Sequence, residues 1–183
     1  MPYIYSINKP YILLSPKSPR LRFINCTPDI LEQLFLGKDH LAYYLKINVP
    51  MKWSDFGEEP FRFVHAHLAQ NPDSANWWSW LPILISENML VGNCGFKGSP
   101  KNGEVEIGYE VAEQYRQRGY ATEIAEALIK YAFRYPEVKT IVAHTLSFEN
   151  PSTSVLRKCG FHFIAEVNDP EDGDIWRWEI KRE

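Results

Sequence analysis

Hydrophobic residues recur with two periods along this chain, and each period predicts a different kind of element. The clearest helical pattern begins after Gly119 and ends before Pro136. Its apolar residues fall at positions i, i+3, i+4, i+7 and i+11, namely Ala121, Ile124, Ala125, Leu128 and Ala132. Such a stripe predicts an amphipathic helix with one face in the core.

The remaining segments predict short strands and further helices. Runs rich in β-branched and aromatic residues predict strands over residues 20–25, 78–86, 89–96, 104–111, 140–146, 161–167 and 174–180. Further helices are expected from residue 28, over 39–47, over 58–70, and from Pro151 to just before Gly160. Short turns join the runs between 78 and 111, which favours an antiparallel meander. The order of the elements indicates a mixed α+β sheet.

Length and composition indicate one packed domain. At 183 residues the chain can bury a core of its own. Its 45% hydrophobic and 14% aromatic residues are typical of a globular protein and exclude a disordered one. Residues 1–19 are interrupted by prolines and show no clear period, so we expect an N-terminal arm before a single domain over residues 20–183.

Charge and cysteine content exclude several classes of function. A net charge of -3 and a pI near 6.0 give no general attraction to nucleic acid, so no direct nucleic-acid partner is expected. Cys26, Cys94 and Cys159 lie far apart and lack metal-ligand spacing, which predicts reduced cysteines, a cytoplasmic protein and no metal. The sequence shows neither a signal peptide nor a run of about 20 apolar residues, so no membrane partner is expected.

The most informative motif is the turn Arg116-Gln117-Arg118-Gly119-Tyr120-Ala121, which joins a strand-like run to the amphipathic helix. The first turn of a helix has N–H groups without intrahelical partners and carries partial positive charge, so it can hold a phosphate. Gly119 would let the backbone approach such a ligand, and the two arginines would add charge. Alone, such a turn is more often solvated surface, but the rest of the sequence reverses that preference.

Two sequence blocks around this turn resemble a known family and indicate that the turn binds a ligand. Residues 103–135 resemble the acetyl-CoA-binding core of the GNAT superfamily of N-acetyltransferases. Arg116, Gly119 and Ala121 fit its signature, which is Gln or Arg, two residues, Gly, one residue, then Gly or Ala. A second block, from Ala143-His144-Thr145-Leu146 through Asn150-Pro151-Ser152-Thr153 to Cys159-Gly160-Phe161, resembles the next strand and helix of the RimJ/RimL-type branch. Residues 91–98 also resemble this branch.

The resemblance implies a GNAT-like fold and acetyl-CoA as co-substrate. That fold is a mixed, mostly antiparallel sheet of about seven strands, flanked by helices and splayed between the fourth and fifth core strands, where the pantetheine arm lies. The residues implied in cofactor binding are Tyr109 and Val111 through their backbone, and Arg116, Gln117, Arg118, Gly119, Tyr120, Ala121, Thr122 and Asn150.

Two of these residues have an equally ordinary interpretation. Thr122 is either a phosphate ligand or a plain residue of a first helical turn. Glu149 stands where the branch usually has an asparagine, and Asn150 follows it. Asn150 is therefore either a pantetheine contact or only the N-cap of its helix.

Candidate proton-transfer groups lie before the turn and after Asn150. Glu104, Glu106 and Glu110 share one strand face and would repel one another, so that face should be partly open to water or ligand. By resemblance, Glu106 would accept the proton of the attacking amine, and a solvated strand face is the alternative. Ser152 would donate to the sulfur of the leaving thiolate, or would simply satisfy backbone groups.

Four other positions bear on the mechanism and the core. Leu156 stands where the superfamily often supplies a tyrosine as general acid. His144 lies in a strand with no acid or serine at triad spacing, which predicts a structural role. Trp78 and Trp80 share strand parity, which predicts that they are buried together.

The sequence thus predicts an acetyl-CoA-dependent N-acetyltransferase that moves an acetyl group to a primary amine by direct attack in a ternary complex, without a metal. The acceptor would be a protein N-terminus or a small amine such as an amino acid, a polyamine or an antibiotic, and residues 27–80 would select it. The alternative is a non-catalytic acyl-CoA-binding or partner-binding module, which the missing tyrosine favours. We expect a monomer or a homodimer.

Overall fold

The computed structural model describes residues 15–170 and 172–183, so residues 1–14 of the predicted arm lie outside it. The strands are β1 (Leu21–Asn25), β2 (Ser79–Leu84), β3 (Met89–Leu90), β4 (Gly92–Phe96), β5 (Glu104–Val111), β6 (Thr140–Leu146), β7 (His162–Asp169) and β8 (Gly173–Lys181). The α-helices are α1 (Pro28–Phe35), α2 (Lys38–Leu45), α3 (Glu59–Gln70), α4 (Tyr120–Ala132) and α5 (Pro151–Lys158). Two 3-10 helices, η2 (Pro72–Trp77) and η3 (Glu113–Tyr115), complete the elements.

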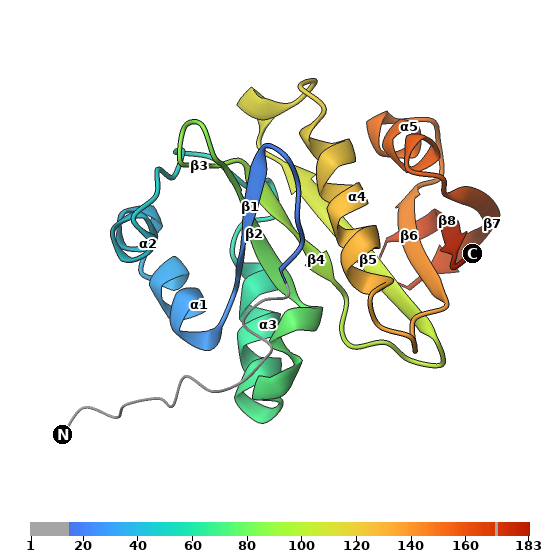
Figure 1. The fold of residues 1–183 in the computed structure, drawn as a ribbon, viewed down its shortest axis with the longest axis horizontal. Coiled ribbons are helices and arrows are strands. Elements are labelled where there is room, and N and C mark those ends of the chain that lie inside the picture. The colour runs from blue at the N-terminus through green and yellow to red at the C-terminus, as the bar shows by residue number, and fades with distance from the viewer. Residues whose placement is uncertain (1–14, 171) are drawn as a thin grey trace.

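These elements form an eight-stranded sheet with helices on both faces (Figure 1). Its order is β1-β2-β4-β5-β6-β8-β7, with β3 paired to β2. All pairs are antiparallel except β5 with β6. The predicted α+β class and the antiparallel meander of β2, β4 and β5 are confirmed. None of the described helices is both long and apolar enough to cross a membrane.

The parallel pair β5 and β6 is short, and this determines where an opening forms. Only Glu104, Val105 and Glu106 of β5 pair with β6, opposite Thr140, Ile141 and Val142. In contrast, β5 stays paired with β4 as far as Val111. The second half of β5 therefore has a partner on one edge only, and the predicted splay between the fourth and fifth core strands is confirmed.

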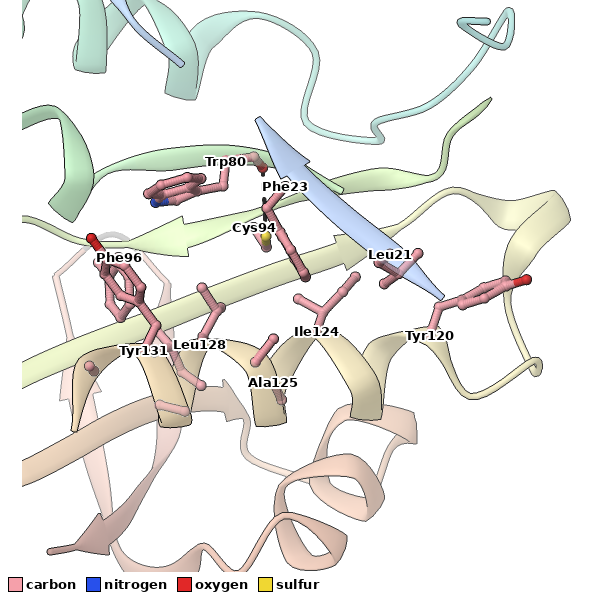
Figure 2. Packing of buried hydrophobic residues seen from close by; sticks show 14 of the residues in the cluster. Leu21, Phe23, Trp80, Cys94, Phe96, Tyr120, Ile124, Ala125, Leu128 and Tyr131 are labelled. Atoms are coloured by element: carbon pink, nitrogen blue, oxygen red, sulfur yellow. Dashed lines mark hydrogen bonds between the residues drawn. The ribbon is translucent and has the colours of Figure 1, made fainter. Parts of the chain in front are cut away.

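Two hydrophobic clusters cover opposite faces of the sheet. One packs α4 and α5 against the sheet, and Figure 2 shows Ile124 and Leu128 of α4 pointing toward Phe23, Trp80 and Cys94. The other cluster lies under α1, α2 and α3. Burying both faces of β2 in this way anchors the domain, because the buried apolar area is the main favourable term in folding.

Two sequence-based expectations in this region are wrong. Trp78 and Trp80 are both buried, but they belong to different clusters, because β2 begins at Ser79 and Trp78 lies outside the strand alternation. The strand expected over residues 89–96 is divided into β3 and β4. The division precedes Gly92, whose backbone passes so close to Glu110 that an added Cβ would lie 2.0 Å from the Glu110 carbonyl oxygen.

We expect Leu128→Ala to destabilise the protein by about 2–5 kcal/mol, because the Leu128 side chain is fully buried between α4 and the sheet and its removal leaves a cavity. Urea unfolding measures this loss. The control is Leu36→Ala, since Leu36 is 61% exposed, and it should change stability by no more than about 0.5 kcal/mol. Equal effects of the two substitutions would contradict the assignment of Leu128 to the core.

Candidate active site

The turn before α4 has the backbone shape of an anion cradle. Gln117 and Gly119 have φ values of 61° and 83°, in the left-handed region, and Gly119 is the N-cap of α4. Within the described part of the chain, the backbone N–H groups from Gln117 to Thr122 donate no hydrogen bond. Consecutive free N–H groups at a helix N-terminus are a site for phosphate oxygens. Among the described residues, an added Cβ at Gly119 would meet only Arg20, at 3.4 Å, so these residues leave the space beside the turn open.

Residues before β1 hold this turn in place. Arg20 donates from its backbone and from Nε to Glu123 in the first turn of α4, at 2.8 and 2.7 Å, and Ser18 also bonds Glu123. The Arg20 guanidinium also reaches the Arg118 carbonyl at 3.2 Å and lies over the Tyr120 ring. The cradle is thus fixed by side chains far away in sequence, which limits the rearrangement that ligand binding requires.

The two arginines of the motif differ in their surroundings. Arg116 donates from Nε to the Val111 carbonyl at 2.9 Å and pairs with Asp55 at 2.6 Å. Its charge is therefore partly neutralised by the protein itself. Arg118 is exposed and lies over the Tyr115 ring, and it forms no ion pair with the described residues. Of the two, Arg118 is the arginine whose charge is free at the mouth of the cradle.

Alternate backbone N–H and C=O groups of β5 point into the opening between β5 and β6. Lys97 N donates to the Glu106 carbonyl and Ala112 N donates to the Val91 carbonyl, so the even-numbered residues bond toward β4. In an antiparallel pair the intervening residues direct their N–H and C=O groups away from that partner. The backbone groups of Ile107 and Tyr109 therefore face the opening, as do those of Val111.

The Tyr109 side chain carries a buried hydroxyl that makes no hydrogen bond with the described residues. Tyr109 packs against the cluster under α4 and α5. Burial, and to a smaller extent the nearby Cys159 thiol, raises the pKa of the Tyr109 phenol above its ordinary value, so it keeps its proton at neutral pH. A buried donor without a partner is costly, which marks this position as one where a ligand could supply the missing acceptor.

On the other face of β5, each of the three glutamates forms a hydrogen bond or an ion pair with another residue. Glu104 pairs with Arg177 of β8 at 2.9 Å. Glu110 accepts from Ser54 at 2.9 Å and from Asn93 at 2.7 Å, and also from the backbone of Asp55. These contacts relieve the repulsion expected from sequence, and all three glutamates remain exposed or half-buried, as predicted.

Glu106 is held by two groups at once. Its Oε1 atom lies 2.6 Å from Nζ of Lys97 and 3.0 Å from Nδ1 of His144. Burial disfavours ionisation of Glu106, but the hydrogen bonds from His144 and Lys97 outweigh it and hold the pKa of the carboxyl below its ordinary value of 4.5. No acid lies at triad spacing from His144 in the sequence, but the β5–β6 register brings Glu106 to it, because Glu106 lies opposite Val142, two residues before His144.

Two hollows lie beside this cluster. The first, of about 370 Å³, is lined by charged side chains that include Lys97, Lys101, Glu106 and Arg177. The second, of about 470 Å³, lies at the end of α3 and along η2, and it shares Ser99 with the first. The first hollow provides room for a polar molecule on the face of β5 that carries Glu106.

The comparisons with known proteins agree with this geometry. Residues 20–162 match the family described as Acetyltransferase (GNAT) domain. The chain belongs to the GNAT acetyltransferase family. It is 32% identical over 109 residues to the uncharacterized N-acetyltransferase YjdG of Bacillus subtilis (strain 168), which covers 59% of this chain and 64% of that relative. The chain thus spans a little less than two thirds of the length of YjdG.

A second relative and a solved structure extend the likeness. This chain is 25% identical over 183 residues to the FsC-acetyl coenzyme A-N(2)-transacetylase of Aspergillus fumigatus. The aligned part covers 84% of this chain and 74% of that relative. The structure of RimL, a ribosomal L7/L12 alpha-N-protein acetyltransferase in complex with coenzyme A, has a TM-score of 0.65 at 16% identity and covers 92% of this chain and 97% of its own. The likeness to the RimL structure shows that the two proteins share the GNAT fold.

At the start of α5, the GNAT helix after β6, the structure assigns a capping role to Asn150. Its side chain accepts from the backbone of Ser152 and Thr153 at 2.9 and 3.2 Å, and its backbone N–H donates to the Thr153 hydroxyl at 3.2 Å, which completes a capping box. The side chain also donates to the Phe148 carbonyl at 2.8 Å. The N-cap interpretation is therefore confirmed. A contact between Asn150 and pantetheine stays a prediction, and the second hydrogen on Nδ2 is the side-chain donor left for it.

Neighbouring positions on α5 leave few groups for proton transfer. Ser152 is half-buried, and its hydroxyl makes no hydrogen bond with the described residues. Leu156 is fully buried. Glu149 is exposed and pairs with Arg157, which lowers the pKa of Glu149 to about 2, so it stays ionised and paired at neutral pH.

Sequence reasoning missed Lys97, His144 and Arg177 as site residues, because only the strand register brings them to the glutamates of β5.

We expect Glu106→Gln to be less stable than wild type at neutral pH, with a difference that shrinks as pH falls. The pKa of Glu106 in the folded protein lies below its ordinary value of 4.5, so the ionised carboxylate stabilises the fold above that pH. This contribution is lost as pH falls through the folded-state pKa. Urea unfolding of both proteins, near neutral pH and below pH 4.5, measures the difference.

The matched control for that series is Glu137→Gln, since Glu137 is exposed and its side chain forms no ion pair within the described residues. This control should match wild type at every pH. A difference between wild type and Glu106→Gln that stays constant with pH would contradict the electrostatic role of the pair with Lys97 and His144.

Proposed function

We propose that this chain is an acetyl-CoA-dependent N-acetyltransferase that moves an acetyl group to a primary amine by direct attack in a ternary complex. The observation that carries this proposal is the cradle of free N–H groups from Gln117 to Thr122 at the end of the β5–β6 opening. Family membership supports the transfer chemistry, and the coenzyme A in the RimL structure supports the choice of co-substrate.

The groups around the opening fit acetyl-CoA along its length. The pyrophosphate would accept from the N–H groups of the cradle, with Arg118 and the Thr122 hydroxyl beside it. The pantetheine arm would pair with the backbone of β5 at Ile107 and Tyr109, like an added strand. The buried Tyr109 hydroxyl, which has no partner among the described residues, would then gain an acceptor in the bound thioester or its sulfur.

The acceptor amine would approach from the polar face of β5, beside the charged hollow. There Glu106 is the carboxylate nearest the parting of the strands, which supports a role in removing a proton from the amine. Ser152, whose hydroxyl forms no bond with the described residues, would donate to the departing thiolate. Attack replaces the C–S bond by a C–N bond, and the amine proton balances the thiol that is released.

The acceptor class follows less directly from the site. RimJ/RimL-type membership would make it a protein N-terminus, and the RimL name supports this choice. The transacetylase relative acts, by its name, at an N(2) position, which supports a small amine. A non-catalytic acyl-CoA-binding module is the second candidate, and one observation favours it, the buried Leu156 at the position of the usual tyrosine acid.

Acetyl-CoA at millimolar concentration should raise the melting temperature of the wild-type protein, because a ligand that binds only the folded state stabilises it by mass action. Gly119→Val should abolish the shift, since its side chain would occupy the open space beside the cradle. Gly173→Val is the matched control. Gly173 also has positive φ, 73°, and an added Cβ there would meet no atom of the described residues within 4 Å, so this variant carries the backbone strain without touching the cradle. An unchanged wild-type melting curve would refute the proposed cofactor.

Thiol release from acetyl-CoA over a panel of amines and N-terminal peptides should identify an acceptor. With that acceptor, Arg118→Ala should raise the KM for acetyl-CoA and leave kcat near its wild-type value, because Arg118 would contact only phosphates that are bound equally in the ground and transition states. A fall in kcat alone would move Arg118 to the reacting centre. Binding of acetyl-CoA without turnover on any acceptor would favour the non-catalytic module.

A further inference from the structure

His144 occupies the first position on the polar face of β6 after the strands part. In the β5–β6 register, the last pair is Glu106 with Val142, and the position on β5 that would face His144 is Gly108. An added Cβ at Gly108 would meet no atom of the described residues within 4 Å, so the described structure leaves the space beside His144 open. A side chain at this point borders the opening itself.

Glu106 is poorly suited to take the amine proton directly. The same Oε1 atom already accepts from Lys97 and lies within hydrogen-bond distance of His144. These contacts hold the pKa of the carboxyl below 4.5, which makes Glu106 a weak base at neutral pH. To accept a proton on Oε1, it would have to give up one of its partners.

The contact with Glu106 also determines which His144 nitrogen can react. A carboxylate only accepts hydrogen bonds, so Nδ1 of His144 carries the hydrogen that faces Glu106. In the neutral imidazole the lone pair is then on Nε2, which forms no hydrogen bond or ion pair with the described residues. The side chain is 20% exposed, so this nitrogen can be reached without moving the strand.

Other charged groups around His144 come from three elements. Lys97, just after β4, neutralises Glu106 from the far side. Arg177 of β8 pairs in register with His144, and it is bound to Glu104 and to Glu179. The imidazole therefore lies in a network whose carboxylates each have a cation, whereas the Nε2 lone pair of His144 has no partner among the described residues.

We propose that His144 is the catalytic base of the transfer and that Glu106 is its positioning residue, an inference that rests on the proposed function. The neutral amine attacks the thioester carbonyl carbon, a C–N bond forms, and Nε2 of His144 accepts one proton from the amine nitrogen. The C–S bond then breaks, and the thiolate takes up one proton. The imidazolium of His144 returns its proton to solvent or to the thiolate, so the products are an amide and a free thiol.

The test compares His144→Ala, His144→Gln, Glu106→Gln and His162→Ala in the turnover assay, over a range of pH. His144→Ala should lower kcat by about 10²- to 10⁴-fold while keeping the melting shift with acetyl-CoA. Added imidazole should restore part of the rate of His144→Ala, because it can enter the vacated space. The wild-type rate should fall at acid pH, where an imidazolium cannot accept a proton, and this inflection should be lost in His144→Gln.

Two controls separate a base from a structural residue. His162 is exposed on β7 and forms no ion pair with the described residues, so His162→Ala should keep the wild-type rate and pH profile. Glu106→Gln should lower kcat and should not respond to imidazole. If His144→Ala keeps kcat within about threefold, or loses it without rescue and with the wild-type pH profile, His144 is not the base. That result leaves the proposed function intact, whereas a wild-type protein inert toward every amine overturns both.

Discussion

The site depends on the parting of β5 from β6. Buried backbone N–H and C=O groups must be paired, so two parallel strands that separate after Glu106 and Val142 leave the second half of β5 open to another partner. The protein satisfies one of these groups itself, by the bond from Arg116 to the Val111 carbonyl. Parallel pairing also requires a crossover, and α4 supplies it. The α4 N-terminus therefore lies at the carboxyl end of β5, so the cradle and the opening follow from one topological constraint.

Glu110 of β5 connects the loop after α2 to the strand that borders the opening. Glu110 holds the segment after α2 through Ser54 and the Asp55 backbone, and Asp55 in turn holds Arg116. The part of the chain expected to select the acceptor is thus bonded to the turn expected to hold the cofactor.

The sequence was sufficient wherever local chemistry decides the structure, and insufficient where register does. The apolar stripe through Leu128 predicted α4, and Asn150-Pro151 predicted the start of α5, because periodicity and capping act within one element. The contact between Glu106 and His144 joins two strands separated by the whole of α4, and only the three-residue parallel register places them together. Trp78 shows the same limit at short range, because strand parity holds only from the residue where the strand begins.

The alternation of side chains along β5 gives the proposed reaction a direction. Glu106 and Gly108 belong to the polar face, beside His144, whereas Tyr109 packs against the cluster under α4 and α5. A proton acceptor on one face and a buried, protonated phenol on the other lie on opposite sides of the opening where a thioester would be bound. With Leu156 at the usual tyrosine position, the Tyr109 hydroxyl, which has no partner among the described residues, is a proton donor on the helical face. An amine entering from the polar face would then expel the thiolate toward the helical face. Attack and departure would thus occur on opposite sides of β5.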